Sequence, residues 1–472
     1  MCNVQGAISG EPQAALAIIR TLQSHGFQAV FAGGCVRDAL RGEQPHDWDI
    51  ATSAHPEQVE ALFPRTIPVG KNFGIIVVLG EDGVGYEVAT FRGEGKYTDG
   101  RHPDSIRYVD MEEDVKRRDF TVNALLYDPI AQKLYDFVGG EADMHAKVLR
   151  AVGDASARFE EDKLRTLRAV RFAARLGFTI EPQTLEAIRV AAYKVPLCVS
   201  PERIAAESEK ILLSGTATCA FNLMEESRLL EYVYPYLYAM IGVEQPPQFH
   251  PEGDVWQHTL KALSVLDETV LRCKAAPDDA PRFDVQDRLQ RASETELRIL
   301  TWGTLLHDIG KPATFERGED RIHFNGHDSI GATMAEEELT ALHLPNEIIA
   351  GASELVRAHM NQLGLKEARV ATRRRRLQNP LYPLILELVR IDTLASFGIL
   401  GFYTQLVAWW KEEMARPVPP KPTITGRDLI ALGIPPSPRF GKMLHDIYDY
   451  ELENPFPSHA AAMEWVKEHY CK

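Results

Sequence analysis

The stretch FAGGCVRDALRGEQPHDWDIATS, residues 31–53, decides the expected fold of the N-terminal part of the chain. It ends one strand, turns at Gly33 and Gly34, and enters a second extended run that contains Asp47 and Asp49. Because side chains alternate along a strand, the two aspartates are expected on one face and the apolar residues between and after them on the other. The pattern predicts two carboxylates that converge on one spot.

Outward from this stretch, strands and helices alternate up to about residue 150. Residues 12–25 have a helical period, Gly26 follows them as a C-cap, and FQAVFA is the next strand. The segments GIIVVLG and VGYEVATF flank the turn EDG and predict a β-hairpin. Beyond residue 155 the apolar period changes to about 3.6, so the remainder is predicted to be helical. The expected fold class is α+β, with a mixed α/β head followed by helices.

Composition bounds the class of protein. The 472 residues are too many for one hydrophobic core, and the hydrophobic and charged fractions of 45% and 25% are those of an ordinary globular protein. The six cysteines form no close pair, which argues against a disulfide framework or a thiolate zinc site. With no signal sequence and no long apolar segment recognised, a cytoplasmic protein without a membrane partner is expected. The net charge of −15 leaves only local basic patches for nucleic acid.

The aspartate pair suits a phosphoryl-transfer site with two Mg²⁺ ions, which carboxylates bind and which neutralise a leaving pyrophosphate. The backbone at Gly33 and Gly34 could approach a triphosphate closely, with both N–H groups turned toward it. Taken alone, however, an Asp-x-Asp pair is more often a surface turn in which Asp47 caps a loop. The neighbouring motifs must therefore decide between the two interpretations.

Four motifs in this order do so: GGCVRD, DWDIATS, KRRDFTVNAL and RFEEDKLRTLRAVRFAARLGF. Together they resemble the class II tRNA nucleotidyltransferases and bacterial poly(A) polymerases of the DNA polymerase β-like superfamily, over about the first 215 residues. The resemblance implies that Asp47 and Asp49 bind the catalytic metals. Glu87 in YEVATF is the third, less certain carboxylate, and Arg37 joins the glycines in binding the nucleotide.

The motif KRRDFTVNAL places Asp119 and Asn123 four residues apart, so a helix beginning near Phe120 would bring them to one side. Asp119 could equally be the N-cap of that helix. The resemblance implies that Arg118, Asp119 and Asn123 contact the ribose and phosphates. Asp119 can serve both purposes only if its oxygens are shared.

A helix from Ser156 to Leu176 is expected to present four arginines on one face. Glu161 and Asp162 could simply pair with them on a solvated surface. The chemistry suggests more, because a carboxylate accepts from the exocyclic amine of C or A and an arginine donates to ring acceptors, whereas G and U present the opposite pattern. EEDKLR matches the family's EDxxR element, which implies that Asp162 and Arg165 select CTP and ATP. The four arginines are Arg165, Arg168, Arg171 and Arg175, of which the first three are expected to bind nucleotide.

The stretch FRGEGKYTDGRHPDSIRYV, residues 91–109, is rich in glycine and charge and is expected to be mobile. In the family, the corresponding loop switches the enzyme from C to A addition. Its presence disfavours an enzyme that adds only the two Cs.

Histidines and carboxylates recur between residues 250 and 392. His307 and Asp308 lie on an apolar segment, where polar groups must be paired or bind a metal. With His258 and Asp392 they resemble the metal-dependent HD phosphohydrolase signature, of which HDIGKP is the most specific part. Nitrogen and oxygen ligands without thiolate suit Ni²⁺, Mn²⁺, Mg²⁺ or Fe. The resemblance also implies a second metal position at His327 and His359 and a phosphate contact at Lys311, whereas His102 and His459 are expected to be ordinary histidines.

The C-terminal part offers a basic run and a tail. Arg373, Arg374, Arg375 and Arg376 are consistent either with a solvated turn or with an RNA phosphate contact that weakens with salt. Residues 274–291 are expected to form a polar loop and residues 416–426 a proline-rich linker. TITGRDLIALGIPPSPRFGKML resembles the family's tRNA-contacting tail, with Thr425 as an N-cap.

The sequence thus predicts a head over 1–150, a helical neck over 151–215, a body with the HD domain over 216–415, and a tail over 416–472. The expected function is untemplated addition of C, C and A to a tRNA 3′ end from CTP and ATP, with two Mg²⁺ ions in the head and a divalent metal in the HD domain. Poly(A) synthesis or A-only addition is the close alternative. HD phosphohydrolysis as the main activity and noncatalytic RNA binding are the alternatives of other classes, and the oligomeric state stays open.

Overall fold

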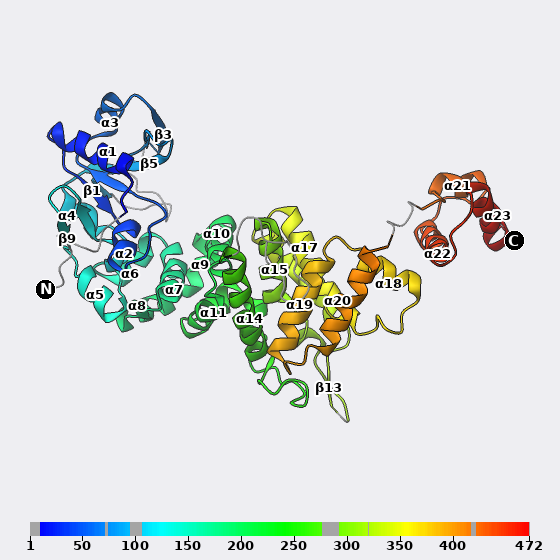
Figure 1. The fold of residues 1–472 in the computed structure, drawn as a ribbon. Coiled ribbons are helices and arrows are strands. Elements are labelled where there is room, and N and C mark those ends of the chain that lie inside the picture. Colours follow the sequence, from blue (N-terminus) through cyan, green and yellow to red (C-terminus); the bar gives the residue numbers. More distant parts are fainter. Residues whose placement is uncertain are drawn as a thin grey trace. The chain divides into compact units, whose positions relative to one another are not determined.

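The computed structural model describes residues 10–70, 74–94, 106–275, 292–319, 321–416 and 422–471. The chain divides into two compact units between Tyr238 and Ala239 (Figure 1). The central part of the predicted loop at 91–109, most of the loop at 274–291, much of the linker at 416–426, and His102 lie outside the described residues. The finer division into head, neck, body and tail stays a prediction.

A seven-stranded mixed sheet forms the head of the first unit. Its neighbouring strands β2 and β5 run parallel and the other pairs antiparallel. The predicted hairpin is confirmed as β4 paired with β5, with Val77 opposite Glu87. In spatial order the strands are β3 (Thr66–Gly70), β4 (Ile75–Leu79), β5 (Gly85–Thr90), β2 (Ile50–Thr52), β1 (Ala29–Ala32), β8 (Leu126–Asp128) and β9 (Lys133–Tyr135).

Both faces of this sheet are covered. On one face, Ile19 and Leu22 of α1 (Gln13–Ser24) pack with Phe31, Trp48 and other strand residues. On the other, residues of α4 (Met111–Lys116) pack with alternate residues of the same strands. Trp48 is buried and the aspartates on either side of it are exposed, so the predicted alternation is confirmed although β2 itself begins only at Ile50.

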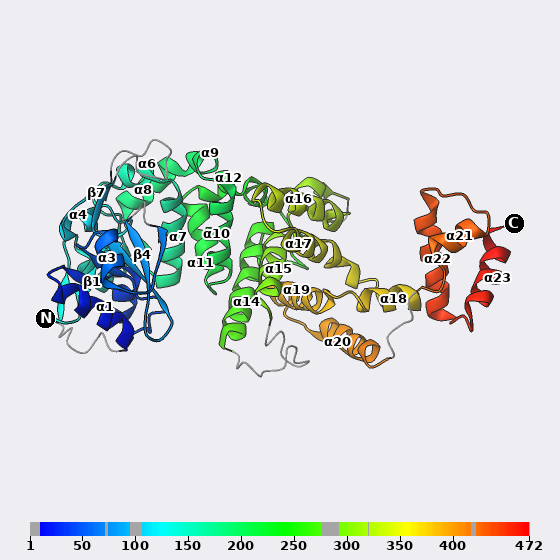
Figure 2. The same cartoon turned by 90° about the horizontal axis from the view of Figure 1, so that it is seen from above.

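Helices complete the first unit, and α7 packs against both α10 and α11 (Figure 2). The expected helix from Ser156 to Leu176 is wrong in one respect: it is broken at Asp162 and Lys163 into α6 and α7. The remaining elements are α2 (Gly34–Leu40), α3 (Pro56–Leu62), β6 (Arg92–Glu94), β7 (Ile106–Tyr108), η3 (Thr121–Asn123), α5 (Gly140–Ala146), β10 (Val148–Leu149), α6 (Ala155–Glu161), α7 (Leu164–Leu176), β11 (Thr179–Ile180), α8 (Pro182–Ala191), η4 (Ala192–Lys194), α9 (Val195–Cys198), α10 (Pro201–Leu212), α11 (Ala217–Glu226), α12 (Leu229–Val233) and α13 (Pro235–Tyr238).

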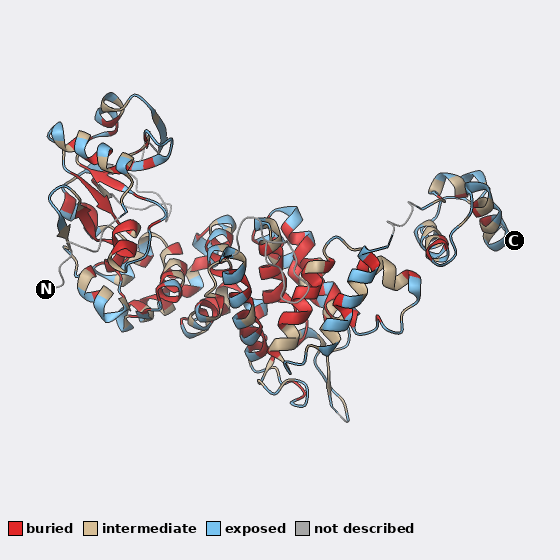
Figure 3. Ribbon diagram, in the orientation of Figure 1, coloured by how far each residue is buried: buried red, intermediate tan, exposed pale blue. Residues whose placement is uncertain are grey.

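The second unit is almost entirely helical, as predicted. Helix α15 packs against α14, α17 and α19. Many residues of these helices are buried, as the red colouring of Figure 3 shows. The predicted polar loop begins later than expected, because α14 continues to Ala275. The elements are α14 (Val255–Ala275), α15 (Glu294–Leu306), η5 (Pro312–Thr314), β12 (Glu316–Arg317), β13 (Ile322–His323), α16 (His327–Ala341), α17 (Asn346–Ala358), η6 (Met360–Gln362), α18 (Val370–Leu377), α19 (Tyr382–Ala395), α20 (Gly401–Met414), α21 (Gly426–Ala431), α22 (Arg439–Glu453) and α23 (His459–Tyr470).

The last three helices share a small apolar core of their own, which includes Leu429, Ile447 and Val466. The predicted N-cap is confirmed, because Thr425 and Asp428 form a capping box at the start of α21. Among the described helices, none combines the length and the apolar composition that a membrane crossing requires.

Candidate functional site

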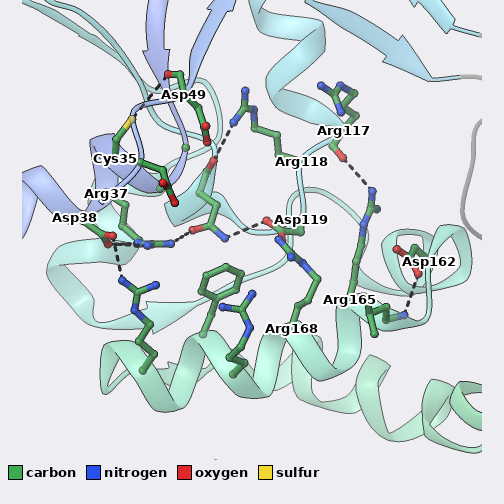
Figure 4. Close-up of a pocket in the computed structure, with 18 of the residues that line it drawn as sticks. Cys35, Arg37, Asp38, Asp49, Arg117, Arg118, Asp119, Asp162, Arg165 and Arg168 are labelled. Atoms are coloured by element: carbon green, nitrogen blue, oxygen red, sulfur yellow. Dashed lines mark hydrogen bonds and ion pairs between the residues drawn. The ribbon is translucent and has the colours of Figure 1, made fainter. Parts of the chain in front are cut away.

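A cavity of about 760 Å³ in the first unit gathers the residues of all four head motifs (Figure 4). Of the predicted head residues, only Glu87 is not among its lining. Those that line it are Gly33, Gly34, Arg37, Asp47, Asp49, Arg118, Asp119, Asn123, Asp162, Arg165, Arg168 and Arg171. Gly33 and Arg171, which are 138 residues apart in sequence, therefore meet at one place, as the resemblance implied.

Asp47 and Asp49 line this cavity, and the nearby Glu87, which does not line it, acts on the charge of Asp49. Ile50 pairs with Val88 across the parallel strands β2 and β5. Asp49 and Glu87 each come one residue before this pair, so they lie next to each other on neighbouring segments. The protein atoms around Asp49, together with the negative charges of Glu87 and Asp47, raise its pKa to about 6. Asp49 is exposed, so its carboxylate lies beside other negative charges but remains accessible to solvent. Like charges of this kind, which Arg118 offsets only in part, fit a cation, and oxygen ligands fit Mg²⁺.

Gly33 provides the turn that links β1 to α2. Its φ of 74° favours glycine, and a Cβ atom there would lie 3.1 Å from Nη1 of Arg118. The expectation that both glycine N–H groups face a triphosphate is wrong for Gly33, because its N–H donates to the carbonyl of Leu125 at 3.0 Å. The residue is needed for the backbone conformation and for the space beside Arg118.

Gly33→Ala is therefore expected to lower the free energy of unfolding by about 1 kcal/mol and to raise the KM for the nucleotide by on the order of tenfold. Gly42→Ala is the matched control, since Gly42 has a φ of 75° but open space around its Cβ position. Thermal unfolding should show similar losses for both variants, while steady-state kinetics should show the KM increase for Gly33→Ala alone. Equal KM values would contradict the role given to the Arg118 contact.

Asp119 and Asn123 are held by a network rather than by the predicted helix. That helix is only the single 3₁₀ turn η3, yet Asn123 Nδ2 still donates to Asp119 Oδ1 at 3.1 Å. The alternative N-cap role of Asp119 is wrong, because the N-cap of this turn is Phe120; Asp119 Oδ1 accepts from the Phe120 N–H, and Oδ2 accepts from Arg168 at 2.6 Å. Burial opposes the charge on Asp119, but Arg168 outweighs it and lowers the pKa of Asp119. Arg37 in turn donates to Asn123 Oδ1 at 2.5 Å.

The break between α6 and α7 places Asp162 between the two helices, whereas Arg165 lies in the first turn of α7. Asp162 accepts two hydrogen bonds from Arg203 of α10, which no sequence pattern had singled out. Arg165 donates to Glu161 at 2.6 Å and to the carbonyl of Arg158 at 3.2 Å, so the expected Glu161 pair forms, but on a side chain that is only 12% exposed rather than on a solvated face. Both residues nevertheless line the cavity, so the ion pairs position them at the site rather than remove them from it.

Arginine dominates the rest of the cavity wall. Arg37, Arg92, Arg117, Arg118, Arg168, Arg171, Arg175 and Arg203 all line it. Guanidinium groups bind phosphate through paired N–H donors, so the wall is suited to a polyphosphate. A local basic patch is thus present despite the negative net charge of the chain.

The second unit holds a separate cluster of buried histidines and carboxylates. His258, His307 and Asp392 form one group whose potential ligand atoms are close enough to share a metal ion, and Asp308, His327 and His359 form another. Asp308 faces both groups: Oδ2 lies 3.3 Å from His307 Nε2, and Oδ1 lies 3.6 Å from His327 Nε2. All four residues of the predicted HD signature are therefore brought together, with the predicted second position beside them.

The orientation of the imidazoles indicates what the cluster can bind. The Nδ1 atoms of His307, His327 and His359 each lie within hydrogen-bonding distance of a backbone carbonyl, and that of His258 lies 2.6 Å from Glu252 Oε1. In neutral imidazoles with Nδ1–H donating, the Nε2 lone pairs face inward. His258 Nε2 lies 3.2 Å from His307 Nε2, and His327 Nε2 lies 3.3 Å from His359 Nε2. Such an arrangement of acceptors fits divalent cations.

The charges around the cluster act differently on its imidazoles, and of His258 and His359 only His359 is favoured as a neutral ring by its shifted pKa. Burial opposes the charge on His258, but Asp392 and Glu252 outweigh it and raise its pKa to about 9. Burial and the neighbouring His307 lower the pKa of His359 to about 4. Asp308 Oδ2 is buried without a hydrogen bond of good geometry, although Lys311 Nζ lies 2.7 Å away in an ion pair.

Local packing explains the HDIGKP motif. A Cβ atom at Gly310 would lie 2.3 Å from the carbonyl oxygen of His327, so only glycine lets α16 approach this closely. Lys311 donates to Gln245 at 2.6 Å and lines a cavity of about 600 Å³ that also reaches Asp308 and Asp392. Glu252, which the sequence analysis did not single out, lies six residues before His258 in FHPEGDVWQH.

The four arginines of the C-terminal run have protein partners. They lie on α18, and Arg374 donates to the buried Glu413 at 2.9 Å. Arg375 pairs with Asp449 of α22, Arg376 donates to the carbonyl of Asn361, and Arg373 lies over the ring of Trp409. These contacts give the run a structural role, and RNA binding by it stays a prediction. His459 is exposed and contacts Asp428, as expected of an ordinary histidine.

Three family descriptions match the chain. Residues 29–150 match the poly A polymerase head domain, and residues 177–240 match a probable RNA and SrmB-binding site of polymerase A. Residues 255–392 match the HD domain.

Curated relatives share the first half of the chain. A CCA-adding enzyme of Geobacillus thermodenitrificans is 46% identical over 222 residues, which cover 47% of this chain and 54% of the relative. One of Lactiplantibacillus plantarum is 48% identical over 227 residues, which cover 48% and 55%. The chain thus spans about half the length of the curated relatives it matches.

Solved structures extend the likeness to almost the whole chain. The Bacillus stearothermophilus CCA-adding enzyme in complex with CTP is 28% identical, with a TM-score of 0.66, over 98% of this chain and 99% of that one. The Thermotoga maritima CCA-adding enzyme complexed with tRNA is 18% identical, with a TM-score of 0.56 over 98% and 97%. The expected fold class is confirmed.

Proposed function

Since its head matches the poly A polymerase family, its helical part carries an HD domain and its fold is that of solved CCA-adding enzymes, we propose that the chain adds C, C and A to the 3′ end of tRNA. CTP and ATP are the nucleotide substrates, and no nucleic-acid template is used. The observation that supports this most directly is the single cavity that collects Asp47 and Asp49, the arginine wall and the pair Asp162 and Arg165.

The carboxylates and the arginines of the head have different roles in the proposed reaction. The tRNA 3′-hydroxyl attacks the α-phosphate in line, and pyrophosphate leaves. Asp47 and Asp49, with Glu87 beside them, would hold two Mg²⁺ ions, which activate the hydroxyl and neutralise the leaving group when bound. Arg37, Arg118 and the arginines of α7 bind the phosphates.

Base choice follows from hydrogen-bonding pattern. The Asp162 carboxylate accepts from the exocyclic amine of C or A, while Arg165 donates to a ring acceptor. U and G place a carbonyl oxygen where the carboxylate requires a donor. One protein pair thus serves both permitted bases and rejects the other two.

A second activity is supported by the histidine cluster. We propose that the two ligand groups of the HD domain hold divalent cations and that this site hydrolyses a phosphomonoester or a 2′,3′-cyclic phosphate. Lys311, at the wall of the adjoining cavity, is placed to bind the substrate phosphate. The Nε2 atoms that face one another are the observation that favours this activity.

The addition activity is tested with tRNA transcripts that lack one, two or three 3′ nucleotides, each incubated with one NTP at a time. Expected products are C on the transcripts that lack CCA or CA, and A only on the transcript that ends in CC. Long A tails from ATP alone would favour a poly(A) polymerase, and A addition without C addition would favour an A-only enzyme. Equal use of all four NTPs would contradict base selection by Asp162 and Arg165.

A further inference from the structure

Arg203 holds the carboxylate of Asp162 in one orientation. Its Nη1 donates to Oδ1 at 3.1 Å and its Nη2 to Oδ2 at 2.7 Å, so the two planar groups meet as a fork. The Leu164 N–H donates to Oδ1 at 3.0 Å as well. The side chains of Asp162 and Arg203 are only 14% and 20% exposed, and both line the cavity. The plane of the carboxylate is therefore fixed before any nucleotide enters.

These contacts leave one hydrogen-bond acceptor position of the Asp162 carboxylate free among the described residues. An ionised carboxylate offers about four acceptor positions. Among the described residues, Arg203 and the Leu164 N–H occupy two positions on Oδ1 and one on Oδ2. One acceptor position on Oδ2 remains. An exocyclic amine can occupy it, whereas the carbonyl oxygen of U or G would face a negatively charged acceptor.

We infer that Arg203 is a positioning residue for base selection, because it aims the last acceptor position of Asp162 at the incoming base. The inference rests on the proposed nucleotide addition and deepens it. Without the fork, the carboxylate can rotate about its χ2 angle, which lowers the affinity for CTP and ATP and weakens the rejection of UTP and GTP. Arg203 contacts no reacting atom, so it acts only through Asp162.

A purely structural role for Arg203 is the competing explanation, since it links α10 to the α6–α7 break. Another ion pair already holds the same helices together: Arg171 of α7 donates to Glu207 of α10 at 2.6 Å. Glu207 is buried, and Lys210 pairs with it too. Loss of Arg203 should therefore leave α10 in place and change the orientation of Asp162.

The test compares Arg203→Met and Arg203→Lys with wild-type protein. Arg203→Met removes the fork but keeps an apolar stem, and it is expected to lower the CTP-over-UTP ratio of kcat/KM about tenfold, mainly through a higher KM for CTP. Arg203→Lys keeps the charge without the planar fork and should restore only part of the ratio. Arg189→Met is the matched control, because Arg189 lies in α8 of the first unit, does not line the cavity, and forms an ion pair with Glu186 of the same helix.

Thermal unfolding and equilibrium binding of CTP and UTP in the absence of tRNA complete the test. A folded Arg203→Met protein that keeps the wild-type ratio within twofold, in both kinetics and binding, would overturn the inference. Wild-type protein that adds no nucleotide would instead overturn the proposed function, and the binding ratio would then decide the role of Arg203. A fall of the ratio in Arg189→Met as large as in Arg203→Met would overturn the inference as well.

Discussion

Asp49→Ala is expected to lower nucleotide incorporation by on the order of 10³-fold or more, while phosphate-ester hydrolysis by the HD domain is unchanged. The surrounding protein, together with the charges of Glu87 and Asp47, raises the pKa of Asp49 to about 6. Those carboxylates repel one another in the folded chain, so their arrangement opposes stability and is consistent with the proposed binding of cations. Incorporation of radiolabelled CTP into a tRNA that lacks CCA measures the effect.

The stability of the Asp49→Ala protein itself provides a first control, because the neighbouring negative charges disfavour the ionised Asp49 in the folded state. Because the folded state disfavours the charge on Asp49, alanine should leave the melting temperature unchanged or raise it slightly. Glu43→Ala is the matched variant, since Glu43 forms an exposed ion pair with Arg41 outside the cavity and should keep full activity. An Asp49→Ala protein that unfolds at lower temperature, or that keeps a tenth of the wild-type rate, would contradict the assignment.

Spacing and alternation predicted much of the cavity because they depend on local geometry. Asp47 and Asp49 share a face by strand alternation, and Arg168 and Arg171 share one by helical period. Arg203 could not be found this way, since its partner lies 41 residues earlier in the chain and only the packing of α10 on α7 brings them together.

Breaks within elements were the other source of error. The apolar period runs through residues 156–176, so it predicts one helix, whereas Asp162 accepts from the Leu164 N–H and ends α6. Short polar side chains compete with the helix for backbone hydrogen bonds in this way, and a periodicity count does not register it. At η3 the error was to predict too long an element. Asp119 and Asn123 are four residues apart, a spacing typical of one helix face, yet the structure forms only a 3₁₀ turn there.

The HD cluster was predictable because buried polar residues need partners. Adjacent His307 and Asp308 in an apolar segment indicated a metal site, and His327 and His359 do lie beside them. Their inward Nε2 atoms depend on the carbonyl acceptors of Phe324 and Val356, each three residues earlier, which no sequence motif marks. The run Arg373–Arg376 shows the converse, since a charged run that suggested an RNA contact is largely paired within the protein.

Asp308→Asn is expected to abolish hydrolysis by the HD domain and to remove bound divalent metal, with nucleotide incorporation unchanged. Asp308 faces both ligand groups, and its positively charged neighbour Lys311 lies 2.7 Å away. Asparagine keeps the size but loses the charge, so neither cation would be held tightly. Metal content by mass spectrometry after dialysis and hydrolysis of a 2′,3′-cyclic nucleotide with added Ni²⁺ or Mn²⁺ measure the two effects.

Asp328→Asn provides the matched control, because Asp328 follows the ligand His327 in α16 but belongs to neither ligand group. It should retain both metal and hydrolysis. Since Asp308→Asn removes one charge of a buried ion pair, thermal unfolding with and without metal must separate misfolding from loss of the cation. A folded Asp308→Asn protein with wild-type metal content would contradict the shared role of Asp308, and hydrolysis that survives chelation of all metal would contradict the HD assignment itself.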